Sequence, residues 1–224
     1  MGIFQLGVAP KIILGETIIP TYTQMFCELH LPPNRLFESA YVWIGVWTDK
    51  LRFMQVGLIS MPPNVSLMNS SRAGKNVIAY ATDSTYYYLQ PFDQLNVNDG
   101  DIILLNLQRV ENTEDWIIGA VSQTNDTGGI CQTYKGVGSS FHISTLKIVF
   151  EGYSGILPTK YIDSGEISLK NIWLKDEGGF MHRLSSPQVY SPTGEEYLQF
   201  KIFEPTPEWL SIKYTDEEVT WLLS

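Results

Sequence analysis

The sequence predicts an all-β protein, a sandwich of two antiparallel sheets or a barrel. Short runs of alternating apolar and polar residues recur along the 224 residues, as in strands with one buried face. Clusters of Pro, Gly, Asn, Asp and Ser separate these runs at short intervals, as turns do. No run keeps a helical periodicity for more than about two turns. About a dozen short strands joined by turns are typical of a sandwich or a barrel.

The first three predicted strands follow one another closely. Residues 22–31 alternate between apolar and polar, and Pro32-Pro33-Asn34 ends the run. Residues 41–47 are rich in aromatic and β-branched side chains, which favour strands. Thr48-Asp49-Lys50 has the composition of a turn, and it leads into an apolar strand at 51–59. We therefore expect a hairpin over residues 41–59.

The rest of the chain continues the strand and turn pattern. A stretch rich in Pro, Ser and Asn at 61–75 is predicted to be a loop. Asn98-Asp99-Gly100-Asp101 and the segment 125–129 are predicted turns, since Asn, Asp and Gly tolerate the backbone angles that turns need. Further strands are predicted at 76–81, 84–90, 102–107, 115–122, 130–135, 145–151, 166–174, 197–203 and 209–214.

The length and the absence of repeats favour a single domain over residues 1–224. The one candidate boundary lies at 176–179, after which residues 180–224 could form an appendage. We expect this tail to supply further strands to the same sandwich.

Charge and composition exclude several partners. The net charge is −9 and no basic patch is evident, so nucleic acid is not expected as a partner. No apolar run approaches the roughly 20 residues of a membrane span, and no ordinary signal peptide is evident. Cys27 and Cys131 lack metal-ligand spacing, and either a long-range disulfide or two free thiols is compatible with them. No metal site and no cofactor are predicted, and the oligomeric state and the compartment stay open.

Two strands place polar side chains among apolar ones. In the strand 51–59, Gln55 shares a face with Phe53 and Gly57, because strand side chains alternate. In the strand 145–151, Glu151 shares a face with Lys147. If both strands belong to one sheet, an amide and a carboxylate could meet on its surface.

Several ordered segments resemble the eqolisins, the glutamic peptidases. Met54-Gln55-Val56-Gly57 is similar to the Leu-Gln-Thr-Gly segment of that family, which carries its catalytic glutamine. The segment 147–151 is similar to the Trp-Ile-Val-Glu segment, which carries its catalytic glutamate. The resemblance covers roughly residues 22–175. Its other segments are Cys27 to Pro32, Ser39 to Val46, Tyr86 to Pro91, Asp99 to Ile102 and Ser164 to Asn171.

The resemblance implies a fold, an activity and a set of site residues. The fold would be a concanavalin-like or jelly-roll-like β-sandwich. The activity would be that of an acid-acting endopeptidase on extended polypeptides, in an extracellular or acidic environment, with Gln55 and Glu151 as catalytic residues. The implied substrate-binding residues are Trp43, Trp47, Asp49, Tyr86, Tyr88 and Gln90.

Three of these residues depart from the family pattern. Tyr88 replaces its acidic residue and Gln90 a tyrosine. Trp47 stands where the family has an aspartate, with Asp49 two residues later.

A glutamine and a glutamate would suffice for peptide hydrolysis. The carboxylate of Glu151 would take a proton from a water and return it to the leaving amine. The amide of Gln55 would stabilise the oxyanion. A shared water requires the two polar groups to lie within about 3–6 Å of one another.

Simpler interpretations exist for the same residues. Gln55 and Glu151 could be ordinary polar residues on a solvated sheet face, and Trp43 and Trp47 could pack in the core. Two non-catalytic functions therefore stand beside hydrolysis. One is a lectin-like binding module that uses the same aromatic face, and the other is a structural protein of a virion or cell surface.

Overall fold

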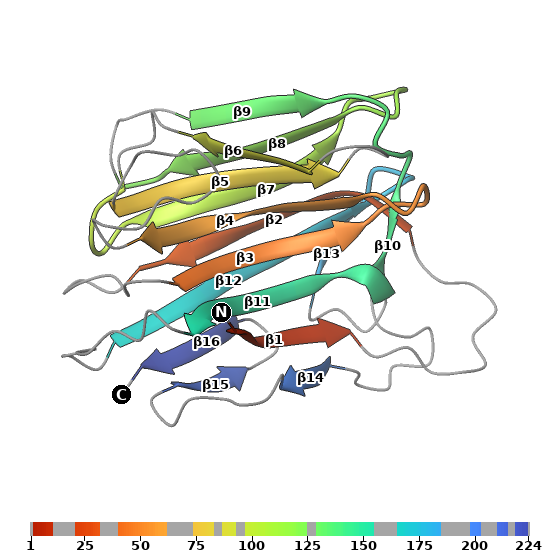
Figure 1. Cartoon of the computed structure of the whole chain (residues 1–224). Helices are drawn as coiled ribbons and strands as arrows, with labels where there is room; N and C mark the ends of the chain where they lie inside the picture. Colours follow the sequence, from red (N-terminus) through yellow and green to blue (C-terminus); the bar gives the residue numbers. More distant parts are fainter. Residues whose placement is uncertain are drawn as a thin grey trace.

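The computed structural model consists of two antiparallel sheets that lie one behind the other (Figure 1). It describes residues 2–10, 21–31, 40–61, 74–82, 87–92, 97–124, 129–154, 165–184, 198–202, 210–214 and 218–223. Within these residues only Ile143–Thr145 is helical, as a single 3₁₀ turn. The all-β sandwich expected from the sequence is confirmed.

One sheet has seven strands. They are β1 Gly2–Pro10, β3 Ala40–Trp47, β4 Phe53–Met61, β5 Gly74–Thr82, β6 Tyr87–Phe92, β11 Lys147–Ser154 and β14 Leu198–Ile202. Their order across the sheet is β14-β1-β11-β3-β4-β5-β6. The predicted hairpin of β3 and β4 is present, and β11 pairs with the other side of β3.

The second sheet has nine strands. They are β2 Thr21–His30, β7 Ile102–Arg109, β8 Trp116–Ser122, β9 Gly129–Tyr134, β10 Phe141–His142, β12 Gly165–Asp176, β13 Met181–Arg183, β15 Leu210–Tyr214 and β16 Glu218–Leu223. Seven of them lie in the order β15-β16-β12-β2-β7-β8-β9, while β10 pairs with β2 and β13 with β12. The segment 176–179 covers the end of β12 and the turn that leads to β13.

Some strands were not predicted from the sequence. β1, β10, β13 and β16 fall outside the predicted ranges, and the predicted start of β11 at residue 145 is a 3₁₀ turn instead. β1 begins at Gly2 and contains two glycines and a proline, which weaken a strand signal. It forms nonetheless, because it pairs with β11 on one side and β14 on the other.

The core lies between the two sheets and is built by alternation. In β3 the side chains of Val42, Ile44 and Val46 are fully buried. The same holds in β4 for Met54, Val56 and Leu58, as the sequence pattern predicts. The nine-stranded sheet contributes Met25, Cys27, Leu29, Ile103, Leu105, Leu107, Trp116, Ile118, Ile167, Leu169 and Leu174. The opposite face of the seven-stranded sheet therefore points outward.

The two cysteines are both free. Cys27 lies on β2 in the core, where burial raises its pKa, and Cys131 is exposed on β9. The open choice between a disulfide and free thiols is thus decided for free thiols. No helix in the described part of the chain is long and apolar enough to cross a membrane.

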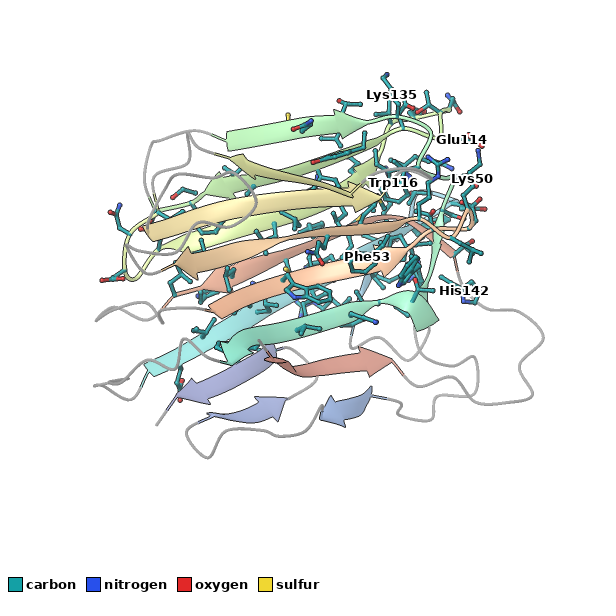
Figure 2. All side chains as sticks on the ribbon, viewed as in Figure 1. Lys50, Phe53, Glu114, Trp116, Lys135 and His142 are labelled. Carbon is teal, nitrogen blue, oxygen red and sulfur yellow. The ribbon has the colours of Figure 1, made fainter. Side chains whose placement is uncertain are left out.

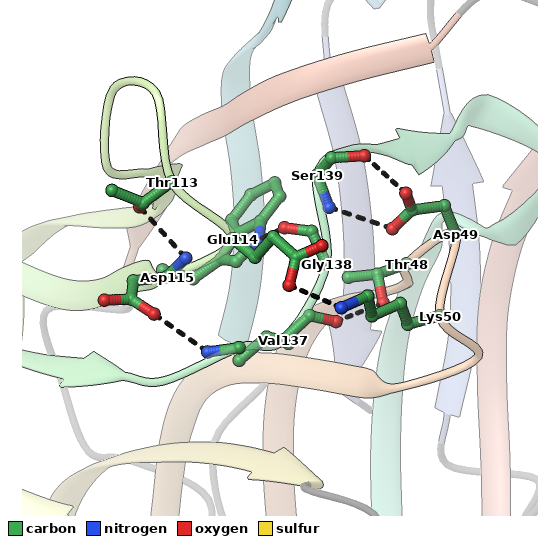
Figure 3. Close-up of polar contacts among 11 residues, drawn as sticks. Thr48, Asp49, Lys50, Thr113, Glu114, Asp115, Val137, Gly138 and Ser139 are labelled. Atoms are coloured by element: carbon green, nitrogen blue, oxygen red, sulfur yellow. Dashed lines mark hydrogen bonds and ion pairs between the residues drawn. The ribbon is translucent and has the colours of Figure 1, made fainter.

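Polar contacts join the two sheets at one end, next to the β3–β4 turn (Figure 3). The Asp49 carboxylate accepts hydrogen bonds from the backbone N–H of Ser139, at 2.9 Å, and from its hydroxyl. The Thr48 hydroxyl donates to the Val137 carbonyl at 2.7 Å. Lys50 forms an ion pair with Glu114 on the loop between β7 and β8.

The buried indole of Trp116 is hydrogen-bonded to the segment between β9 and β10, which also contacts the β3–β4 turn. The Trp116 Nε1–H donates to the Gly138 carbonyl at 2.7 Å, and Trp116 is fully buried. Together these contacts attach the β3–β4 turn to the second sheet. They therefore hold the backbone just before β4, the strand that carries Gln55.

Candidate functional site

The outer face of the seven-stranded sheet carries the residues singled out from the sequence. Alternation brings to this face Trp43, Gly45 and Trp47 from β3, Phe53, Gln55 and Gly57 from β4, and the positions of Lys147, Val149 and Glu151 from β11. Trp43 and Val149 are buried yet lie outside the core cluster between the sheets. This face is therefore more apolar than a solvated sheet face normally is.

Three aromatic rings form a cluster on this face. The ring centroids of Trp43 and Phe53 lie 5.7 Å apart and edge to face, and those of Trp47 and Phe53 lie 5.1 Å apart. Trp43 is 4% exposed, whereas Trp47 is 38% exposed. Figure 2 shows the side chains on the ribbon, with Phe53 labelled. The cluster thus has a packed base, Trp43, and an accessible edge, Trp47.

Two glycines make room for these rings. A Cβ on Gly45 would lie 2.7 Å from Phe53 Cζ and 2.9 Å from Trp43 Cζ3. A Cβ on Gly57 would lie 2.1 Å from the Val42 carbonyl oxygen and 2.6 Å from Trp43 Cβ. These positions need glycine because aromatic rings and neighbouring backbone occupy the space above them.

Gln55 sits beside the aromatic cluster and is half-buried. Its side chain makes no hydrogen bond with any residue that the structure describes. Across the sheet its register partner is Gly45, and the partner of Gly45 on β11 is Lys147. Because directly opposed residues share a face, Gln55 and Lys147 flank Gly45 in one row.

Glu151 lies on the same face but not in that row. Its register partner is Tyr41, whose partner on β4 is Ile59, four residues beyond Gln55. Strand spacing and rise then separate the Cα atoms of Gln55 and Glu151 by about 16 Å.

This register bears on the expectation that their polar groups lie within about 3–6 Å, which stays a prediction. A common water would need both side chains extended fully toward one another. The structure describes the backbone of Glu151 but not its side chain.

Lys147 is the site residue that sequence reasoning did not select. Its place on the face of Glu151 follows from alternation, but its place opposite Gln55 depends on the pairing of β11 with β3. A lysine in a predicted strand is normally interpreted as a solvated residue. No local sequence pattern predicts the register between strands that are about a hundred residues apart.

The other predicted substrate-binding residues fall in different places. Tyr86 lies outside the described residues. Tyr88 is opposite Ala81, which is opposite Met54 on β4. Gln90 is likewise opposite Ala79, which is opposite Val56, and both Met54 and Val56 are fully buried.

By backbone register, Tyr88 and Gln90 therefore stand in the rows of Met54 and Val56, and their role in substrate binding stays a prediction. Tyr80 and Leu89 occupy the row of Gln55 instead. Both oxygens of Asp49 are held by Ser139, so this carboxylate is engaged in the sheet connection.

Comparison with solved structures identifies the architecture. Two structures of scytalido-glutamic peptidase, one with a peptide-based transition state analog and one with a transition state analog inhibitor, match at 10% and 9% identity. Their TM-scores are 0.56 and 0.59, and each match covers 99% of this chain and 98% of the other. The chain has the fold of the glutamic peptidases.

A third structure extends this similarity. SCP-B, a member of the eqolisin family in a complex with the tripeptide Ala-Ile-His, matches with a TM-score of 0.56 and 10% identity. That match also covers 99% of this chain and 98% of the other. Protein-family models and curated sequences give no match. At about 10% identity the similarity shows the fold of the glutamic peptidases.

The part of the chain that the structure describes contains no cluster of metal ligands. No group of three or more His, Cys, Asp or Glu residues there could hold a metal ion. The candidate site consists of the aromatic cluster of Trp43, Trp47 and Phe53, the amide of Gln55 and the cation of Lys147.

The close contacts of Gly57 generate a stability prediction. Gly57→Ala should lower the free energy of unfolding by about 1–3 kcal/mol, because the new methyl group overlaps backbone atoms that cannot rotate away. Urea denaturation followed by tryptophan fluorescence measures the change. Gly129→Ala on β9 is the matched control, since its methyl group would meet mainly the Cγ2 of the exposed Val121. Equal effects of the two substitutions would contradict the packing described for Trp43.

Proposed function

We propose that this chain binds polypeptides in extended conformation on the outer face of the seven-stranded sheet. The observation that carries the proposal is the aromatic cluster of Trp43, Trp47 and Phe53 beside the amide of Gln55, which has no partner among the described residues. The glutamic peptidases of the same fold were solved with a peptide-based analog and with a tripeptide, which supports a polypeptide as the ligand class.

The chemistry of this face suits an extended peptide. A primary amide offers two donors and an acceptor, so Gln55 can bond both the C=O and the N–H of a peptide group. The exposed edge of Trp47 offers apolar area that loses little conformational entropy on binding. A peptide laid across both groups would bury apolar surface and satisfy the half-buried amide at the same time.

The proposal predicts which sheet binds. Trp47→Ala should weaken binding of an unfolded, fluorescently labelled casein fragment by about 5- to 30-fold, since buried tryptophans commonly carry about 1–2 kcal/mol of binding free energy. Fluorescence anisotropy at neutral pH measures the dissociation constant.

Trp173→Ala is the matched control for Trp47→Ala. Trp173 is half-buried on β12 of the other sheet, where it stacks on Phe26 with ring centroids 6.4 Å apart and lies under the guanidinium of Arg183. This substitution should leave the dissociation constant unchanged within about twofold. The reverse pattern would move the binding surface to the nine-stranded sheet and overturn the proposal.

A second candidate function is acid endopeptidase activity by Gln55 and Glu151. The observation in its favour is that both positions lie on one face of one sheet, with β3 as the only strand between them. In this mechanism the ionised carboxylate deprotonates a water, and the Gln55 N–H₂ donates to the oxyanion. The step consumes one water per peptide bond and needs no nucleophilic side chain.

Acid conditions also affect the fold itself. Burial raises the pKa of Asp176, but the contacts with His182 Nε2, 2.8 Å away, and with the Phe180 N–H outweigh it, and the pKa falls below its ordinary 3.8. Burial likewise raises the pKa of Glu28, and hydrogen bonds from Asn171 and His30 lower it below 4.5.

The sign of the pH effect follows from these lowered values. A carboxylate whose folded pKa lies below its unfolded pKa stabilises the fold above about pH 4, and the contribution is lost as the pH falls through the folded pKa. Stability should therefore decline below about pH 4.

The decisive assay for hydrolysis compares variants on denatured casein between pH 2 and 5. If Gln55 and Glu151 act as described, Glu151→Gln abolishes turnover and Gln55→Ala reduces it about 10²- to 10³-fold. Circular dichroism at each pH must show that every variant is folded, because acid weakens the contacts of Asp176 and Glu28. Absence of cleavage by the folded native chain, or equal cleavage by native chain and Glu151→Gln, removes this second function and leaves polypeptide binding.

A further inference from the structure

Lys147 differs from most lysines whose side chains the structure describes. Lys50, Lys135 and Lys170 each form an ion pair with a carboxylate. Lys147 forms no ion pair with any described residue, although it is half-buried. A cation in such a place gains from an anionic partner, because its hydration is already reduced.

The row of Gln55, Gly45 and Lys147 has the dimensions of a binding site for one small anion. Two strand spacings separate the Cα atoms of Gln55 and Lys147 by about 9–10 Å. Gly45 between them has no side chain, and the rings of Phe53 and Trp43 cover it. An ammonium from one side and an amide N–H₂ from the other can both donate to one carboxylate held between them.

Among the side chains that the structure describes, no carboxylate is placed to fill this site. On the same face of β11 the nearest acidic position is Glu151, four residues or about 13 Å along the strand. Asp49 and Glu114, near the end of β3, are engaged with Ser139 and Lys50. The described carboxylates near this row are thus distant or engaged, which leaves Lys147 and Gln55 available to a carboxylate of a ligand.

We propose that Lys147 and Gln55 form a subsite for a carboxylate of the bound polypeptide, so that the outer face prefers acidic peptides. This inference rests on the polypeptide binding proposed above and names the substrate class of the same site. The carboxylate could belong to an Asp or Glu side chain or to the C-terminus of the peptide. Both present the same group, and the peptides tested can separate them.

The experiment uses the full chain and three labelled peptides of one extended sequence. The first has a central Glu and blocked ends, the second has Gln in its place, and the third is the Gln peptide with a free C-terminus. The Glu peptide should bind about tenfold more tightly than the Gln peptide, as expected for a hydrogen-bonded charge. A gain for the third peptide alone would assign the subsite to the C-terminal carboxylate.

Variants of Lys147 test the assignment. Lys147→Gln should abolish the difference between the Glu and Gln peptides, Lys147→Arg should keep most of it, and Lys147→Glu should invert it in favour of a Lys peptide. Lys175→Gln is the matched control, because Lys175 is also half-buried, lies on β12 of the other sheet and forms no ion pair with a described residue. This control should retain the tenfold preference.

The outcomes separate this inference from the function on which it rests. Equal binding of all three peptides by the native chain overturns the carboxylate subsite and leaves polypeptide binding standing. An acidic preference that survives Lys147→Gln, in a variant with native melting behaviour, also overturns the subsite. Failure of every peptide to bind overturns the proposed function and the subsite together.

Discussion

The antiparallel register across β11, β3 and β4 decides which side chains meet on the outer face. It puts Gln55 opposite Gly45 and Gly45 opposite Lys147, and it puts Glu151 in the row of Tyr41 and Ile59. A shift by two residues would keep every inward side chain in the core and change every pair on the outer face. The chemistry of the site therefore depends on backbone pairing more than on the identity of any one residue.

Packing fixes that register from both faces of the sheet. On the inner face Ile44, Val56 and Ile148 are almost fully buried in the core. On the outer face the close contact of Gly57 with Trp43 leaves no room for another partner. At the strand ends, Asp49 and Thr48 attach the turn to the connection between β9 and β10. The backbone beneath the aromatic cluster is therefore held by packing on both faces and by the turn at its end.

Alternation and turn signals were enough to predict the sandwich and most of its strands, because both are local properties of the sequence. They were also enough to place Gln55 and Phe53 on one face of β4. The role of Lys147 and the inner rows of Tyr88 and Gln90 could not be predicted, since they depend on pairing between distant strands. β1 was missed for the same reason, because its neighbours rather than its own residues stabilise it.

The most direct test of this account is a crystal structure of the chain with an extended acidic peptide. The account predicts the peptide on the outer face of the seven-stranded sheet, over Trp43 and Phe53. Its carboxylate should lie within about 3.2 Å of both Lys147 Nζ and Gln55 Nε2. A peptide bound to the nine-stranded sheet would contradict the account, as would a water held jointly by Gln55 and Glu151 with Lys147 turned away.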